Sequence, residues 1–345
     1  MKFLLPSQQF FCTKSYIVGK AKIERMAAVL TDFRRTVLSQ PIALAAVGML
    51  VLASLIQPNI LSLSNVLVVL RQVAVMAIMA IGVTYVLKAG RIDLSIGSLL
   101  SLCTVTTVML HEVLGPIPAM VIALCVGILS GCVAGFLVGY VRLNSLITTL
   151  GMMSILQGIT LVVTGGVAAY ISNPDDTWFR LFGRAYVLGI PVPVIIVIVL
   201  GLIFGLVLTK TVFGRHIAAV GGGEIASIFS AIDSRRTIFM TFVISGALTS
   251  IAAIVLASRA MTAKTDVGSG YELTVLAGVF LGGTSLMGGS GGVGRSLMGL
   301  VVLGFLANAL IVFGAPYYAQ WITQMVIIIA AVWFEVASRR RTVLA

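Results

Sequence analysis

Side chains that could carry out acid–base, nucleophilic or metal chemistry are sparse in this chain of 345 residues. It has only two histidines, and three of its four cysteines, Cys103, Cys125 and Cys132, lie within apolar runs. No HExxH, no GxSxG with suitable partners and no Cys/His cluster occurs, and the nucleotide-binding pattern GxxxxGK[ST] is absent. The sequence therefore predicts no catalytic residue, no metal site and no cofactor in this chain, and any ATP chemistry would belong to another subunit.

Carboxylates stay out of the middle of the apolar runs. Asp93 and Glu272 fall at junctions, Asp266 falls in a loop, and Glu335 lies beside the terminal arginines. Carboxylates in mid-span would indicate a proton relay or ion-coupled transport. Their positions argue against an ion-coupled secondary transporter or channel, which remains the weaker alternative, and they fit a neutral substrate.

The segment KAGRIDLSIGS, residues 88–98, is the first of two clusters of polar and small residues. An Asp after a glycine turn can cap the next helix, because its oxygen accepts hydrogen bonds from free backbone N–H groups. We expect Asp93 and Gly97 to have structural roles. Ser95 and Ser98 are candidates for a polar path across the membrane.

The second cluster, GGTSLMGGSGGVG at 282–294, interrupts apolar sequence with glycines. A helix broken inside the membrane exposes backbone groups to a substrate, whereas a tight turn between packed helices has the same composition. Both interpretations stay open. Gly282 and Gly283 are candidate path residues, and Gly288 and Gly289 are candidate structural residues.

Three further polar residues lie inside apolar runs. Arg71 would reach the lipid headgroups or face a polar path, and its neighbour Gln72 is a candidate path residue. Asn308 would form hydrogen bonds between helices or line a pore, and it is also a candidate path residue.

Apolar runs must position all of these residues. With 59% hydrophobic residues, 10% charged residues and a mean hydropathy of +1.12, the chain is not an ordinary soluble enzyme. A spanning helix needs about 20 apolar residues, so we expect an all-α, polytopic membrane protein with about ten transmembrane helices. The predicted runs are 41–57, 66–87, 94–110, 118–140, 145–165, 191–209, 238–257, 273–287, 293–313 and 319–336. The run at 273–287 is short and rich in glycine, so a re-entrant segment is the alternative there.

The distribution of charge predicts the orientation. The net charge is +12, and an even number of spans places both termini on one side. With the termini in the cytoplasm, 18 of the 23 Lys and Arg residues would lie on the cytoplasmic side, four on the opposite side, and Arg71 within a span. This excess follows the positive-inside rule.

The predicted organisation is a basic cytoplasmic tail at 1–40, a transmembrane domain at 41–338 and a short cytoplasmic tail at 339–345. The domain includes a long cytoplasmic segment, 210–237, which places apolar residues at helical spacing from Ile225 to Ile232. A short helix on the cytoplasmic face, a docking surface or a plain loop would each fit this pattern.

Three motifs carry a resemblance that covers the chain from about Pro41 to Arg339. They are RIDLSIGS at 91–98, TVFGRHIAAVGGGEIAS at 211–227 and SGYELTVLAGVFLGGTSLMGGSGGVG at 269–294. Together, in this order, they resemble the permease subunits of bacterial monosaccharide ABC importers of the ribose/xylose/galactose type.

The resemblance implies a permease of the type II ABC importer kind in the bacterial inner membrane. It would form the path for a monosaccharide or related polyol and would not itself be an enzyme. A branched-chain amino acid ABC permease has a related architecture and is the nearest alternative.

The resemblance also implies partners. They are an ATPase subunit that holds ATP and Mg²⁺, an extracytoplasmic sugar-binding protein, a second permease subunit (identical or similar) and membrane lipid, with no nucleic acid. By the same likeness, 210–237 is the segment that couples to the ATPase. Its core positions would be Gly214, Arg215, Gly221, Glu224 and Ala226.

The chain departs from the family pattern in two places. The family usually has glycine where this chain has Arg91, and the GGGE sequence at 221–224 lacks the Asn that the family tends to show before its Glu. We expect the first change to alter local packing and the second to remove any contact specific to Asn.

Overall fold

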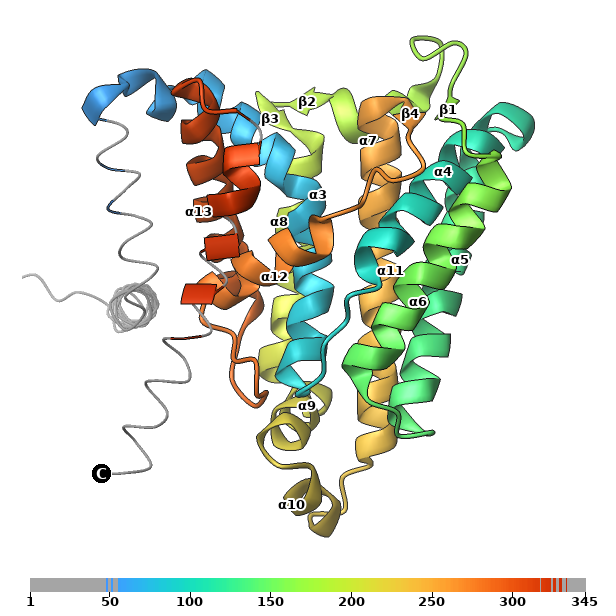
Figure 1. Cartoon of the computed structure of the whole chain (residues 1–345), viewed down its shortest axis with the longest axis vertical. Coiled ribbons are helices and arrows are strands. Elements are labelled where there is room, and N and C mark those ends of the chain that lie inside the picture. Colours follow the sequence, from blue (N-terminus) through green and yellow to red (C-terminus); the bar gives the residue numbers. More distant parts are fainter. Residues whose placement is uncertain are drawn as a thin grey trace, which may run out of the picture.

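A computed structural model of the chain describes residues 55–316, together with 48, 51, 318–323, 325–326, 329–330 and 333. In chain order, the elements are η1 (Pro58–Leu61), α3 (Leu63–Lys88), α4 (Ile96–Leu114), α5 (Pro116–Gly139), α6 (Ser145–Thr164), β1 (Ala169–Tyr170), η2 (Trp178–Arg180), α7 (Leu181–Arg184), β2 (Tyr186–Val187), β3 (Ile190–Pro191), α8 (Val192–Lys210), α9 (Val212–Gly222), α10 (Glu224–Phe229), α11 (Ser234–Ala260), β4 (Thr262–Ala263), α12 (Tyr271–Leu281) and α13 (Val293–Val312). Figure 1 shows a helical bundle with the short strands gathered at one end and α9 and α10 at the other. We call these the strand end and the α10 end.

The apolar runs predicted the long helices well. Within the described residues, seven helices are long and apolar enough to cross a membrane: α3, α4, α5, α6, α8, α11 and α13. Each overlaps one predicted run, which confirms an all-α protein with several spans. The count of about ten is not confirmed. The run at 41–57 lies mostly outside the described residues, as do both predicted tails, and 319–336 is described only in part.

The run predicted at 273–287 forms a shorter helix. α12 has 11 residues, which gives a length of about 16 Å. This is roughly half of the hydrocarbon thickness of a bilayer. The chain then turns through 282–292 before α13 begins, so α12 does not span by itself. Because β4 lies at the strand end and the loop 282–292 contacts Lys88 at the other end of the bundle, the stretch from β4 through α12 crosses the bundle and does not return to the end where it began, unlike a re-entrant segment.

Several helices begin at side chains that accept hydrogen bonds from the first turn. Ser62 accepts from the third residue beyond it at the start of α3, and Asn144 accepts from two backbone N–H groups at the start of α6. Thr211 and Asp233 do the same for α9 and α11. These oxygens replace partners that the first N–H groups of a helix otherwise lack.

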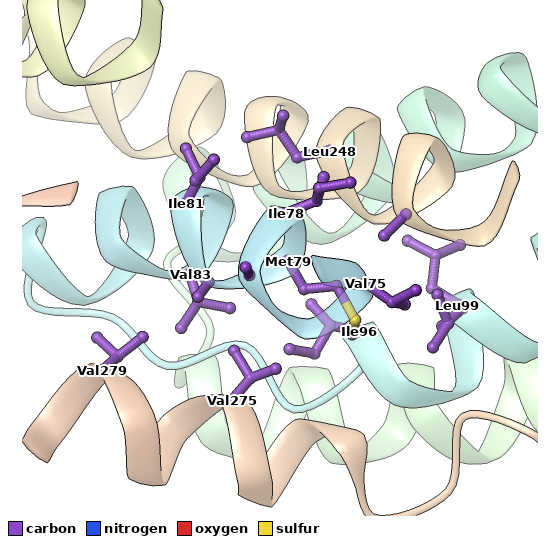
Figure 2. Close-up of a cluster of buried hydrophobic side chains, with 14 of the residues drawn as sticks. Val75, Ile78, Met79, Ile81, Val83, Ile96, Leu99, Leu248, Val275 and Val279 are labelled. Carbon is purple, nitrogen blue, oxygen red and sulfur yellow. The ribbon is translucent and has the colours of Figure 1, made fainter. Parts of the chain in front are cut away.

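α3 is the buried centre of the bundle, since nearly every residue from Val73 to Leu87 is enclosed. Figure 2 shows part of this core, with side chains of α3 packed against those of α4, α11 and α12. The labelled residues are Val75, Ile78, Met79, Ile81 and Val83 of α3, Ile96 and Leu99 of α4, Leu248 of α11, and Val275 and Val279 of α12. In contrast, only 11% of the apolar window of α8 is buried. A helix that is apolar on all sides and exposed in this way is suited to lipid.

Helices α5 and α11 pack with their backbones in close contact. Glycines recur every fourth residue of α5, at Gly127, Gly131, Gly135 and Gly139, on one face of the helix. A Cβ built on any of them would lie 2.5–2.8 Å from a backbone oxygen of α11. Small residues permit such close approach between membrane helices, so this face of α5 excludes side chains.

The strand end is closed by a small cap. β1 pairs with β4 and β2 pairs with β3, both antiparallel. Arg71 of α3 donates from Nε to the Gly183 carbonyl oxygen (3.2 Å) and lies over the Tyr186 ring, 5.8 Å from its centroid. Arg71 thus fastens the cap to α3, a role that neither sequence interpretation of this residue had included.

We expect Gly131→Val to lower the midpoint of thermal unfolding in detergent. A Cβ at Gly131 would lie 2.5 Å from the Phe242 carbonyl oxygen, and overpacking of this kind typically costs about 1–3 kcal/mol. Gly151→Val in α6 is the matched control, because a Cβ at Gly151 meets no atom within 4 Å. Equal midpoints for the two variants would contradict the backbone contact.

Candidate functional site

The α10 end is built around a contact between three backbones. A Cβ at Gly221 of α9 would lie 2.5 Å from the Gly289 amide nitrogen, and one at Gly288 would lie 2.7 Å from the Gly90 Cα atom. The Gly289 N–H donates to the Lys88 carbonyl oxygen (2.9 Å). The end of α3, α9 and the loop 282–292 therefore touch without intervening side chains. This packing fits the tight-turn interpretation of the second glycine cluster and a structural role for Gly288 and Gly289.

The residues predicted for coupling occupy α9 and α10, with different environments. Gly214 is buried against the end of α8, and Gly221 lies in the three-backbone contact. Arg215 and Ala226 are exposed, and Glu224 begins α10 in a half-buried position. The structure therefore brings these five residues to one end of the molecule, but only two of them point outward.

Glu224 bridges two arginines from different connections of the bundle. Its Oε2 accepts a hydrogen bond from Arg91 Nη2 at 2.5 Å, and its Oε1 accepts one from Arg142 Nη1. Arg142 Nη2 also donates to Ser234 Oγ at the start of α11 (3.1 Å). We call Arg91, Glu224 and Arg142 the arginine–glutamate bridge.

The sequence did not predict this bridge. Arg91 had been noted only as an added charge, and Arg142 only as one of many cations that set the orientation. The two arginines are 133 and 82 residues from Glu224, and no short-range pattern connects such positions. Opposite charge was the sole signal, and many pairs in the chain share it.

The bridge has an excess of positive charge. Burial lowers the pKa of the Arg91 guanidinium from its ordinary value. The pKa of Arg142 is lowered mainly by burial and, to a smaller extent, by the positive charge of Arg235. Guanidinium groups nevertheless stay protonated in proteins. Within the bridge, one carboxylate balances two cations that repel each other, and the nearby Asp233 carboxylate offsets part of this repulsion at Arg142 by raising its pKa.

α10 presents an apolar surface outward. Ile225 is 75% exposed, Phe229 is 88% exposed, and Ile228 lies between them with more than half of its surface exposed. We call these three residues the α10 apolar face. Exposed apolar patches with a polar border typically mark an interaction site.

Asp93 and Glu272, both at junctions in sequence, are buried. Asp93 is 4% exposed; its Oδ1 accepts from the Ser95 N–H (3.0 Å) and Ser95 Oγ (2.6 Å), and its Oδ2 accepts from Ser245 Oγ of α11 (3.0 Å). Glu272 is 7% exposed and accepts from the Gly270 N–H (3.1 Å). Asp93 therefore does not cap α4 as expected: the N-cap residue is Ser95, whose side chain makes no capping hydrogen bond, and Asp93 instead accepts from the Ser95 N–H and ties this connection to α11. Among the described residues, no group of three or more His, Cys, Asp or Glu residues could hold a metal.

The start of α4 packs closely against the segment before α12. A Cβ at Gly97 would lie 2.8 Å from the Gly268 carbonyl oxygen, and the Gly268 N–H donates to Ser101 Oγ (2.8 Å). Ser98 is buried beside this contact. The expected structural role of Gly97 follows from this lack of space.

Two path candidates, Gln72 and Asn308, line the same cavity, of about 270 Å³. It lies between α3, α12, α13 and the segment that contains Gln320 and Trp321, and Thr274 also contributes to its wall. Asn308 forms a reciprocal amide pair with Asn65 (2.8 and 3.3 Å), so it both joins helices and faces the cavity. The other path candidates, Ser95, Ser98, Gly282 and Gly283, do not line it.

Comparison with known proteins places these features in context. A family model described as "Branched-chain amino acid transport system / permease component" matches residues 65–331. The ribose import permease protein RbsC of Haemophilus influenzae is 36% identical over 302 residues, which cover 86% of this chain and 93% of the relative.

Two further relatives are similar at comparable levels. RbsC of Bacillus subtilis is 35% identical, over 83% of this chain and 89% of its own length. The L-arabinose transport system permease protein AraH of Escherichia coli K12 is 33% identical, over 81% of this chain and 84% of its own length. No solved structure matches the chain.

We expect Asp93→Ala to destabilise the protein by about 1–3 kcal/mol, because it leaves buried donors on Ser95 and Ser245 without an acceptor. The midpoint of thermal unfolding in detergent measures the effect. Asp175→Ala is the control: Asp175 is 80% exposed and pairs only with Arg180 at the surface, so its removal should change stability by less than about 1 kcal/mol. Similar losses for both variants would contradict the role assigned to Asp93.

Proposed function

The chain belongs to the family described as branched-chain amino acid transport system / permease component, and we propose that it forms the path by which a monosaccharide or related polyol enters the cell. It is a permease subunit of an ABC importer of the sugar type and not an enzyme. Similarity to ribose and arabinose permeases over more than four-fifths of the chain carries this proposal. The same relatives do not favour a branched-chain amino acid as the substrate.

A permease of an ABC importer works with an ATPase subunit and a binding protein. In our proposal ATP and Mg²⁺ are bound by the ATPase, and the binding protein delivers the sugar from outside. A second permease subunit, identical or similar, completes the membrane part in the bacterial inner membrane, and lipid surrounds it. Nucleic acid has no part.

We place the α10 end in the cytoplasm, with both chain termini on the same side. Cations are abundant near that end and are fewer at the strand end. At the α10 end they are Lys88, Arg91, Arg142, Lys210, Arg215, Arg235, Arg236 and Arg295, and at the strand end Arg71, Arg180, Arg184, Arg259 and Lys264. The positive-inside rule supports this orientation.

The α10 apolar face is the surface proposed to dock on the ATPase. Phe229 is the most exposed residue of this face. The exposed cations Arg215, near the start of α9, and Arg235 and Arg236, at the start of α11, belong to the same end of the molecule. An apolar groove with an acidic rim on the ATPase would complement this surface. The exposed Arg215 and Ala226 belong to it, while Gly214 and Gly221 fix α9 on the bundle.

The structure offers a route from this surface to the cavity. α9 touches the end of α3 and the loop 282–292, which joins α12 to α13. The same three helices, α3, α12 and α13, line the cavity that contains Gln72 and Asn308. In this proposal a displacement of α9 reaches the walls of the path through these helices, since α9 touches them at the end opposite Gln72. Transport then requires that ATP binding stabilise one arrangement over the other.

The chemistry of the cavity suits a neutral, hydroxyl-rich solute. Gln72, Asn308 and Gln320 offer amide donors and acceptors, Thr274 offers a hydroxyl, and Trp321 offers a flat apolar surface. We therefore centre the proposed path on Gln72 and Asn308. Ser95, Ser98, Gly282 and Gly283 would act at a distance from this cavity.

Uptake of labelled sugar by vesicles tests the proposed function. With the chain, its ATPase and the sugar-loaded binding protein, we expect uptake that depends on ATP. Phe229→Ala should reduce both uptake and ATPase stimulation, while Leu202→Ala, on exposed α8, should leave them unchanged. Uptake by vesicles that contain the chain alone, without ATP, would reject the importer and support a secondary transporter.

Gln72→Leu tests the path. Gln72 is exposed to the cavity, and loss of a hydrogen bond to a neutral solute should reduce the uptake rate by about two- to tenfold, with ATPase stimulation retained. Gln57→Leu, an exposed glutamine outside the cavity, is the control. Unchanged uptake in Gln72→Leu would move the path elsewhere.

A further inference from the structure

The arginine–glutamate bridge joins three segments at one carboxylate and reaches a fourth through Arg142. Arg91 lies in the connection from α3 to α4, Arg142 in the connection from α5 to α6, and Glu224 at the start of α10. Arg142 extends the contact to Ser234, the first residue of α11. α10 also packs on α9, from which only Gly223 separates it, and buries Ser227, but its apolar face points outward. The bridge is the contact that ties α10 to the connections from α3 to α4 and from α5 to α6.

Both oxygens of the Glu224 carboxylate are occupied within the chain. Oε2 faces Arg91 and Oε1 faces Arg142. The three side chains are 25–36% exposed, so solvent screens the bridge less than a fully exposed surface pair. The two intramolecular contacts fix the orientation of this carboxylate and leave about a quarter of its side chain exposed.

We propose that Arg91 and Arg142 are positioning residues that fix α10 on the bundle through Glu224, so that Glu224 acts inside the chain and does not contact the ATPase. The proposal rests on the proposed function of the α10 end as a docking surface. It also gives a role to Arg91, a cation that the related family usually lacks: Arg91 pairs with one oxygen of Glu224 while Arg142 pairs with the other.

The charges of the bridge lead to a specific expectation. Glu224→Gln removes the only carboxylate of the bridge and leaves Arg91 beside Arg142, whose guanidiniums already oppose each other. Like charges at short range destabilise a structure. Removing Arg142 as well relieves this repulsion, so the double variant Glu224→Gln/Arg142→Ala should be less impaired than Glu224→Gln alone. A glutamate that contacts the ATPase gives no such recovery.

The test uses the full chain with its ATPase and binding protein in vesicles, and it measures sugar imported per ATP hydrolysed. We expect about a tenfold loss in this ratio for Glu224→Gln, a smaller loss for Arg91→Ala or Arg142→Ala, and partial recovery in the double variant, as for residues in one network. Arg142→Lys should retain most of the ratio because the charge remains. Arg295→Ala is the control, an exposed cation at the same end that lies outside 210–237 and has no ion pair among the described residues.

A second measurement does not depend on transport. Chymotrypsin cleavage after Phe229, in the full chain in detergent, reports how firmly α10 is held. We expect Glu224→Gln to be cut several times faster than the wild type and the double variant to be cut at an intermediate rate. If wild-type vesicles import no sugar, the proposed function fails, and the cleavage rates still decide the role of the bridge.

Two results would overturn the proposal. One is a loss in the double variant that equals or exceeds the combined losses of Glu224→Gln and Arg142→Ala, whether the loss is of transport or of protection from chymotrypsin. The other is wild-type behaviour of Arg91→Ala and Arg142→Ala together with loss of ATPase binding in Glu224→Gln, which would make Glu224 a docking residue.

Discussion

The architecture at the α10 end depends on one steric constraint: three backbones meet where no side chain fits. A Cβ on Gly221 of α9 or on Gly288 of the loop 282–292 would clash with neighbouring backbone, and Gly288 lies directly against Gly90 after α3. Positive φ angles at Gly90 and Gly288 let the chain leave this contact at once. The position of α9 relative to the bundle, and of α10 beyond it, follows from this junction. The arginine–glutamate bridge then secures α10 from the other side.

The glycine junction positions α9 on the bundle, and buried polar groups join the helices within the bundle. Within a bilayer, unsatisfied backbone and side-chain groups are costly, so polar residues must find partners inside the protein. Asp93 binds donors from its own connection and from α11, and Asn308 pairs with Asn65. These contacts hold separate helices in register, while apolar packing around α3 supplies most of the enclosed surface.

The positions of the long helices could be predicted from sequence because each needs a run of apolar residues, and seven of the predicted runs correspond to such helices. The end of α12 could not be predicted, because the predicted apolar run continues to residue 287 whereas the helix ends at Leu281. The sequence also does not show how deeply a residue is buried. Asp93 and Glu272 lie at the junctions of predicted runs, yet both are buried in the structure. The partners of Glu224 escaped prediction because they are distant in the chain, and their pairing depends on how the connections meet in three dimensions.

The glycine face of α5 has a mechanical consequence. Two packed helices slide past each other when interlocked side chains change rotamers, which is the basis of shear motions. Along α5, the four glycines place its backbone against the backbone of α11. Because few interlocked side chains lie along this contact, we expect α5 and α11 to move together as one unit. Ser234 of α11 contacts Arg142, which lies in the connection that follows α5. The pair of helices α5 and α11 therefore holds one arginine of the bridge.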